Sequence, residues 1–119
     1  MMKLTVVSDD GDVARVQCEG EISQVRFQAE GNPLETLLGA GGYARKVLLN
    51  LDRTEWIDSS GISWLIVNHK RFQQAGGRLV LHSLPPRVSQ VLQFCKMDRV
   101  FHIADDEADA RARVAGGQR

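Results

Sequence analysis

The stretch Val47-Leu48-Leu49-Asn50-Leu51 does most to narrow the folds that this chain can adopt. All of its residues except Asn50 are large and aliphatic, and a strand that is apolar on both faces must be covered on both faces. Such strands lie inside parallel sheets that carry helices. Trp56 and Ile57 continue the strand toward the polar segment Asp58-Ser59-Ser60-Gly61. The sequence therefore predicts an α/β fold.

The residues after this polar segment have the periodicity of a helix. Its apolar face is expected to contain Ile62, Leu65, Ile66, His69 and Phe72. Gly76-Gly77 ends this helix, and a strand over 78–82 follows. Pro85-Pro86 begins another helix, which continues to Cys95.

The residue pattern in the last part of the chain predicts a short strand followed by a C-terminal helix. The strand is expected over 100–103 and the helix over about 105–115, with acidic residues at its start and arginines at its end. The apolar face of this helix is mostly alanine. We therefore expect it to dock loosely and to fray at Gly116-Gly117.

The first part of the chain predicts a β-hairpin. A strand over Lys3 to Ser8 leads to the turn sequence 9–12, which contains Asp-Gly. The next strand alternates, with one face formed by Ala14, Val16, Cys18 and Ile22 and the other by Arg15, Gln17, Glu19 and Glu21. Gly31-Asn32-Pro33 indicates a turn and a short helix through Leu38.

Helices that connect neighbouring strands make right-handed crossovers between parallel strands. We therefore expect one mixed sheet, with an N-terminal hairpin and then parallel strands, packed with helices. The 119 residues suit a single domain with a core over about 3–104. An exposed edge strand at Leu4 to Val7 could pair with a second copy, so a homodimer is compatible with the sequence.

Composition excludes several classes of protein. With 43% hydrophobic and 25% charged residues, the chain is typical of a globular protein, and no apolar run suits membrane insertion. The N-terminus lacks a secretory signal, which predicts a cytoplasmic protein. Acidic and basic residues number 15 each, which argues against nucleic acid as the main partner. Cys18 and Cys95 form no CxxC motif and are expected to be buried without a disulfide.

Asp58-Ser59-Ser60-Gly61 is the segment that most suggests a function. It lies between a strand end and a helix start, where open α/β sheets place functional loops. The helix N-terminus favours an anion, and a phosphate on a serine there would add about −1.5 to −2 charges beside Asp58. The same residues also suit a structural role, in which Asp58 or Ser59 caps the helix and Gly61 eases the turn. The four residues alone leave both roles open.

Over about Val13 to Ala110, the chain resembles the STAS domain family, named for sulfate transporters and anti-sigma factor antagonists. The segments that carry the resemblance are Gly20-Glu21-Ile22, 47–51, 57–62, 76–81, 88–94, Met97 and Val100-Phe101. Their order and spacing are more similar to the free-standing bacterial anti-sigma factor antagonists than to transporter tails.

The resemblance implies a partner switch that regulates transcription. In that group the unphosphorylated antagonist binds an ATP-dependent serine kinase that sequesters a sigma factor, and binding releases the sigma factor. The kinase then phosphorylates the second serine of the motif, the complex separates, and a serine phosphatase resets the switch. Ser60 is thus the implied phosphorylation site, with Asp58, Ser59 and Gly61 as flanking partner-binding residues. No enzymatic activity, cofactor or metal is implied.

Two features near the expected partner surface depart from the family pattern. Ser23, which we also expect to bind the partner, stands where family members commonly carry an acidic residue, and Gly31-Asn32-Pro33 replaces part of a longer helix. Trp56 and Trp64 bracket the motif and could each anchor a partner or fill the core. Because Trp64 is offset from the apolar stripe of its helix, we expect it to be exposed and to bind the partner.

Enzymatic functions fit the sequence less well. A serine hydrolase would hold its nucleophile in G-x-S-x-G, a pattern that the residues around Ser59 and Ser60 do not complete. His69 is expected to be partly buried, and His82 and His102 to lie at the surface near strand ends. The three histidines also lack the spacing of metal ligands.

Two further alternatives concern nucleotides and scaffolding. Gly39-x-Gly41-x-x-Ala44 fits a loose dinucleotide pattern, but it precedes a strand instead of following one. The main alternative within the family is an unphosphorylated scaffold, for instance a subunit of an ABC-type lipid or solute transport system or of a signalling complex. In that case Ser59 and Ser60 would be simple helix caps.

Overall fold

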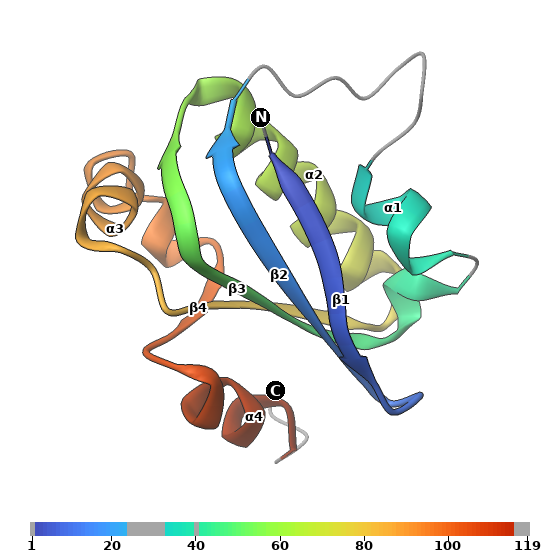
Figure 1. Cartoon of the computed structure of the whole chain (residues 1–119). Coiled ribbons are helices and arrows are strands. Elements are labelled where there is room, and N and C mark those ends of the chain that lie inside the picture. Colours follow the sequence, from blue (N-terminus) through green and yellow to red (C-terminus); the bar gives the residue numbers. More distant parts are fainter. Residues whose placement is uncertain (1, 24–32, 40, 116–119) are drawn as a thin grey trace.

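The computed structural model of the chain describes residues 2–23, 33–39 and 41–115. It shows a mixed β-sheet with helices packed on both faces (Figure 1). The strands are β1 (Lys3–Asp9), β2 (Val13–Ile22), β3 (Lys46–Ile57), β4 (Arg78–His82) and β5 (His102–Ala104). The helices are α1 (Pro33–Leu38), α2 (Ser59–Ala75), α3 (Pro86–Phe94) and α4 (Glu107–Ala115), with short 3₁₀ turns at Gly42–Ala44 and Met97–Arg99.

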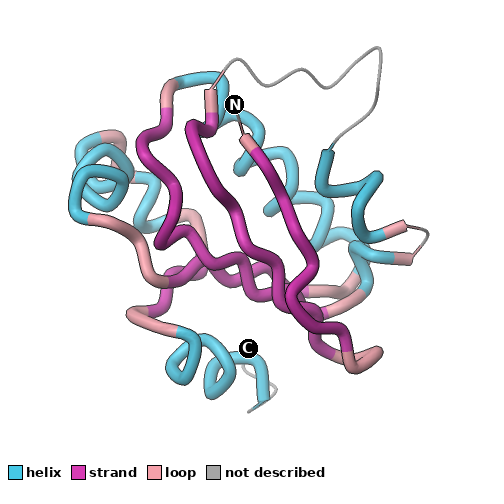
Figure 2. The backbone as a smooth tube through the Cα atoms, viewed as in Figure 1, coloured by secondary structure: helices cyan, strands magenta, loops and turns pink. Residues whose placement is uncertain are grey.

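The strands lie in the sheet in their order along the chain, β1-β2-β3-β4-β5 (Figure 2). β1 and β2 form the expected antiparallel hairpin. Its turn is held by Asp9, which accepts a hydrogen bond from the Gly11 N–H at 2.9 Å, and by Asp10, which accepts one from the Val13 N–H at 2.7 Å. The remaining neighbours pair in parallel. The predicted mixed sheet is therefore confirmed.

The larger core lies between the sheet and helices α1, α2 and α3. Val47 and Leu49 of β3 enter it together with Leu65 of α2 and Leu92 of α3. The alternating residues of β2 that were predicted to face inward are all buried. Burial of this apolar surface is the main force that holds α2 against the sheet.

The opposite face of the sheet carries α4. Leu48 of β3 and Val80 of β4 point to this face and pack against Ala110 and Val114 of α4. Because β3 is apolar on both faces, it is covered on both, as the sequence predicts. The expected loose docking of α4 is wrong, since Ala110 is fully buried and Val114 nearly so.

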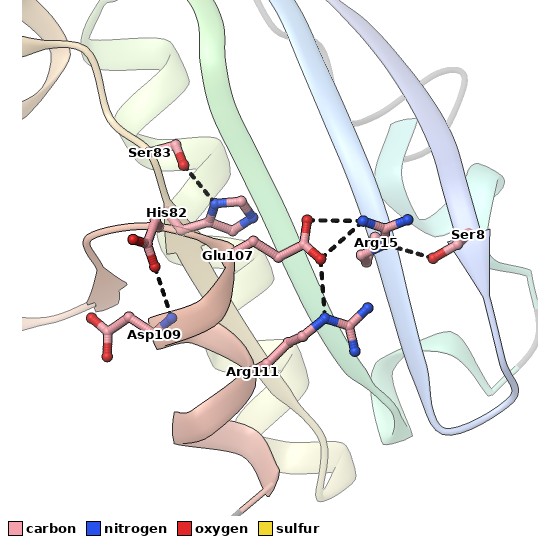
Figure 3. A network of polar contacts seen from close by, with 8 residues as sticks. Ser8, Arg15, His82, Ser83, Glu107, Asp109 and Arg111 are labelled. Carbon is pink, nitrogen blue, oxygen red and sulfur yellow. Dashed lines mark hydrogen bonds and ion pairs between the residues drawn. The ribbon is translucent and has the colours of Figure 1, made fainter.

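An ion-pair network also ties α4 to the hairpin (Figure 3). Arg15 of β2 donates to both carboxylate oxygens of Glu107 at 2.9 Å and to the Ser8 hydroxyl at 2.7 Å. Arg111 donates to Glu107 at 3.0 Å. The two arginines hold the pKa of the Glu107 carboxyl below its usual range. The sequence gives no signal for this long-range network.

Three other expectations are corrected by the structure. Cys95, the C-cap residue of α3, is exposed, whereas Cys18 is buried as expected. His82 is buried beside the start of α4, where its Nδ1 lies 2.8 Å from the Ser83 hydroxyl. The last strand begins at His102, because Met97–Arg99 forms a 3₁₀ turn before it. The predicted turn at residues 31 and 32 and the fraying at 116 and 117 lie outside the described residues.

Candidate functional site

Asp58 alone lies between the end of β3 and the start of α2, and Ser59, Ser60 and Gly61 form the first turn of α2. The segment lies at the predicted junction of strand and helix, and we call it the Asp58–Gly61 loop. Asp58 is extended and is the N-cap residue of α2. Its Oδ1 accepts a hydrogen bond from the Gly61 N–H at 3.0 Å, and its carbonyl accepts one from the Ile62 N–H at 2.9 Å. Asp58, and not Ser59, is therefore the residue that caps the helix.

The two serines of the loop differ in their surroundings. Ser60 is half-buried, and its hydroxyl donates a hydrogen bond to Oδ1 of Asp58 at 2.7 Å. Ser59 is exposed in the same first turn of α2. Both side chains lie at a helix N-terminus, where backbone N–H groups and the helix dipole favour negative charge.

Gly61 is required by close packing against β2. A Cβ atom at this position would lie 2.0 Å from the backbone oxygen of Ile22 and 2.8 Å from Cγ1 of Ile57. The Asp58 N–H also donates to the Ile22 oxygen at 3.3 Å. The first turn of α2 is thus held directly against the end of β2, and this contact fixes the position of Ser60 relative to the sheet.

The end of β2 brings further predicted site residues to this loop. Ser23 follows Ile22, is half-buried and donates from its hydroxyl to Glu21 at 3.4 Å. Glu21 pairs in register with Trp56 of β3, two residues before Asp58. The site therefore combines a serine pair with acidic side chains and an aromatic residue at one end of the sheet.

The two tryptophans that bracket the motif differ in burial. Trp64 is fully buried and belongs to the larger core, so its predicted exposure and partner contact are wrong. The buried face of α2 includes Asn68, whose side chain donates to the Trp64 carbonyl at 2.8 Å. The Tyr43 hydroxyl donates to the side-chain oxygen Oδ1 of Asn68, also at 2.8 Å. Trp56, by contrast, is 41% exposed beside the loop.

The histidines and the surface hollow lie outside this loop. His69 is buried against the rings of Phe101 and His102, and burial lowers the pKa of both His69 and His102. A shallow hollow near the C-terminal end of α2 is lined in part by Tyr43 and Arg71, and Arg71 is paired with Glu35 at 3.0 Å. Across residues 2–23, 33–39 and 41–115, no three His, Cys, Asp or Glu side chains gather in a way that could hold a metal ion.

The sequence matches the family model of the STAS domain over residues 5–110, and the chain belongs to this family. BtrV of Bordetella bronchiseptica, named as a candidate anti-sigma factor antagonist, is 29% identical over 112 residues, which are 93% of each protein.

Solved structures show the same fold. An anti-sigma factor antagonist from Mycobacterium paratuberculosis aligns with a TM-score of 0.69 at 20% identity and covers 97% of this chain and 95% of its own. The antagonist SpoIIAA in its unphosphorylated form aligns with a TM-score of 0.62 at 22% identity, over 98% of this chain and 99% of its own.

None of the helices in the described part of the chain combines the length and apolar character needed to cross a membrane.

Proposed function

We propose that this chain is a bacterial anti-sigma factor antagonist. In this function it acts in the cytoplasm as a non-enzymatic regulator that binds an anti-sigma serine kinase, and phosphorylation of Ser60 ends the binding. The observation that carries the proposal is the Ser60 hydroxyl in the first turn of α2, 2.7 Å from the Asp58 carboxylate, in a chain of the STAS domain family. The name of BtrV and the likeness to SpoIIAA support the same function.

The surroundings of Ser60 explain how a phosphate would act as a switch. The phosphate would add about −1.5 to −2 charges and would remove the hydroxyl proton that Ser60 donates to Asp58. The helix N-terminus tolerates this charge within the chain. At a protein interface, like charges brought together cost several kcal/mol, so the complex separates while the fold persists.

The proposed partner surface surrounds the Ser60 loop. Ser59 and Trp56 are exposed on this surface, and Ser23 is half-buried beside it. The buried residue Gly61 allows the first turn of α2 to pack closely against the end of β2 beneath the surface. In this proposal the kinase supplies the nucleotide and its phosphate, a serine phosphatase removes the phosphate, and nucleic acid binds to neither state. Sigma factor release follows from occupation of the kinase by the unphosphorylated chain.

A capture experiment tests this function. The wild-type chain, Ser60→Ala, Ser60→Asp and the control Ser63→Asp would be used as baits in lysate of the source organism, with bound proteins identified by mass spectrometry. Ser63 is exposed in the same helix, so it controls for added charge. We expect all baits except Ser60→Asp to recover a serine kinase of the anti-sigma type, and all four baits to remain folded. Recovery of the same partner by all four baits would refute the switch.

A scaffold function is the second candidate, because the hydrogen bond from Ser60 to the capping Asp58 can also serve stability alone. In that case every bait should recover the same transport or signalling subunit, and the only effect of Ser60→Ala should be a loss of about 1 kcal/mol of unfolding free energy.

A homodimer is also proposed for the free chain. β1 is an edge strand with Val6 37% and Val7 55% exposed, and an unpaired strand edge can pair with a second copy. Sedimentation across a concentration series would show whether the dimer forms.

A further inference from the structure

The hydrogen bonds of the loop point to a chemical role for Asp58. We propose that Asp58 accepts the Ser60 proton during phosphoryl transfer, so that the substrate protein itself supplies this group. The same contact directs the phosphate to Ser60 in preference to the neighbouring Ser59. This inference rests on the proposed function, in which a partner kinase phosphorylates Ser60.

The geometry places the acceptor on the reacting oxygen. Oδ1 of Asp58 lies 2.7 Å from the Ser60 Oγ and 3.0 Å from the Gly61 nitrogen. The helix cap therefore fixes the carboxylate by a backbone contact, and the Ser60 hydroxyl donates to an oxygen that is already held in place. Hydrogen bonds from a hydroxyl to a carboxylate are short and strong. The Ser60 proton is therefore directed at the carboxylate of Asp58.

Phosphoryl transfer needs an acceptor for this proton. The Ser60 Oγ attacks the γ-phosphorus of a nucleoside triphosphate held by the kinase, and an O–P bond forms. The bond from that phosphorus to the oxygen bridging to the β-phosphate breaks, and the nucleoside diphosphate leaves. The hydroxyl proton passes to Oδ1 of Asp58 and from there to solvent. Protein kinases place an aspartate at the substrate hydroxyl for this purpose, and such a group typically contributes about 10²–10⁴-fold to the rate.

Replacement of Asp58 by Asn separates this role from the structural one. Asn caps helices about as well as Asp, and its side-chain oxygen can still accept from the Gly61 N–H and the Ser60 hydroxyl. The amide removes the negative charge and the capacity to take a proton. Glu55→Gln is the matched control, because it removes a charge from an exposed residue of β3, three positions before Asp58.

The test is a single-turnover phosphorylation of the wild-type chain, Asp58→Asn and Glu55→Gln. The kinase recovered with the wild-type chain is loaded with MgATP, each chain is added at saturating concentration, and the phosphate is mapped by mass spectrometry. We expect Asp58→Asn to react about 100-fold more slowly, with a larger share of its phosphate on Ser59. Its thermal midpoint should match that of the wild-type chain, and the saturating concentration keeps any change in its affinity for the kinase from affecting the measured rate. Glu55→Gln should react at the wild-type rate.

The other outcomes overturn the inference in distinguishable ways. Reaction of Asp58→Asn at the wild-type rate would remove the proton-acceptor role and leave the proposed function intact. A slow reaction that recovers fully at higher chain concentration would assign Asp58 to binding alone and would also overturn the inference. If the wild-type chain takes up no phosphate, or takes it up elsewhere, the proposed function fails and the inference fails with it.

Discussion

Gly61→Ala is predicted to destabilise the protein and to loosen the loop that presents Ser60. The added Cβ would lie 2.0 Å from the Ile22 oxygen, so the start of α2 and the end of β2 must separate by about 1 Å. Both sides of this contact are held by backbone, because the Asp58 N–H donates to the same oxygen. A flexible side chain is therefore not available to absorb the strain.

The size of the effect follows from three contributions. Overpacking at a rigid contact costs about 1–3 kcal/mol, and loss of the Asp58–Ile22 hydrogen bond costs about 0.5–1.5 kcal/mol. Alanine regains up to about 1 kcal/mol over glycine through its helix propensity. Because the overlap at Gly61 is with backbone, we expect the upper end of the packing cost and a net loss of about 3 kcal/mol.

Urea unfolding followed by far-UV circular dichroism measures this loss. Ser63→Ala is the control, because it changes helix propensity at an exposed position of α2 and should gain a few tenths of a kcal/mol. A Gly61→Ala chain that loses less than about 1 kcal/mol, or gains stability, would refute the close contact between α2 and β2.

Three further predictions concern the core, the cysteines and pH. Trp64→Ala should lose about 3–5 kcal/mol of unfolding free energy, because Trp64 is fully buried, whereas Trp56→Ala should lose about 0.5 kcal/mol and weaken kinase binding; equal losses of stability would contradict this. A thiol reagent should label exposed Cys95 in the folded chain and spare Cys18, because burial raises the pKa of the Cys18 thiol to about 11; labelling of both at one rate would show that Cys18 is accessible. Burial lowers the pKa of His82 from 6.5, so the unfolded state binds its proton more readily and stability falls as the pH drops below about 6.5 toward the lowered value. A pH series of thermal midpoints should show a smaller fall for His82→Gln, and an unchanged fall would remove His82 as a cause.

Local patterns predict most of the fold and the position of the loop. The alternation in β2 and the doubly apolar run in β3 follow from strand geometry alone, and both are observed. Asp58 at the strand end marks the helix start, and the structure shows it as the cap. These features depend on residues that are close together in the sequence, so they can be predicted from one amino-acid sequence.

The sequence mispredicts burial in two situations. In one, a polar side chain is buried because its hydrogen bonds are satisfied, and in the other, a segment distant in sequence covers the residue. The offset of Trp64 from the apolar stripe of α2 predicts an exposed side chain, but the buried face of the helix also includes Trp64 and the polar residue Asn68. Asn68 is buried all the same, since Trp64 and Tyr43 satisfy its hydrogen bonds, and the buried face is rotated accordingly. His82 was placed at the surface because it ends a strand, yet α4 packs over the sheet beside it through the Arg15–Glu107 pair. Contacts between such distant segments leave no periodic pattern in the sequence.

The most direct test of the central claim is the affinity of the chain for its kinase with and without phosphate on Ser60. Chain carrying phosphoserine only at residue 60 would be prepared and titrated against the recovered kinase by calorimetry, beside the unmodified chain. A cost of about 3 kcal/mol from like charge at the interface predicts a Kd about 100-fold higher for the phosphorylated chain, with an unchanged thermal midpoint. Equal Kd values for the two chains would contradict the account.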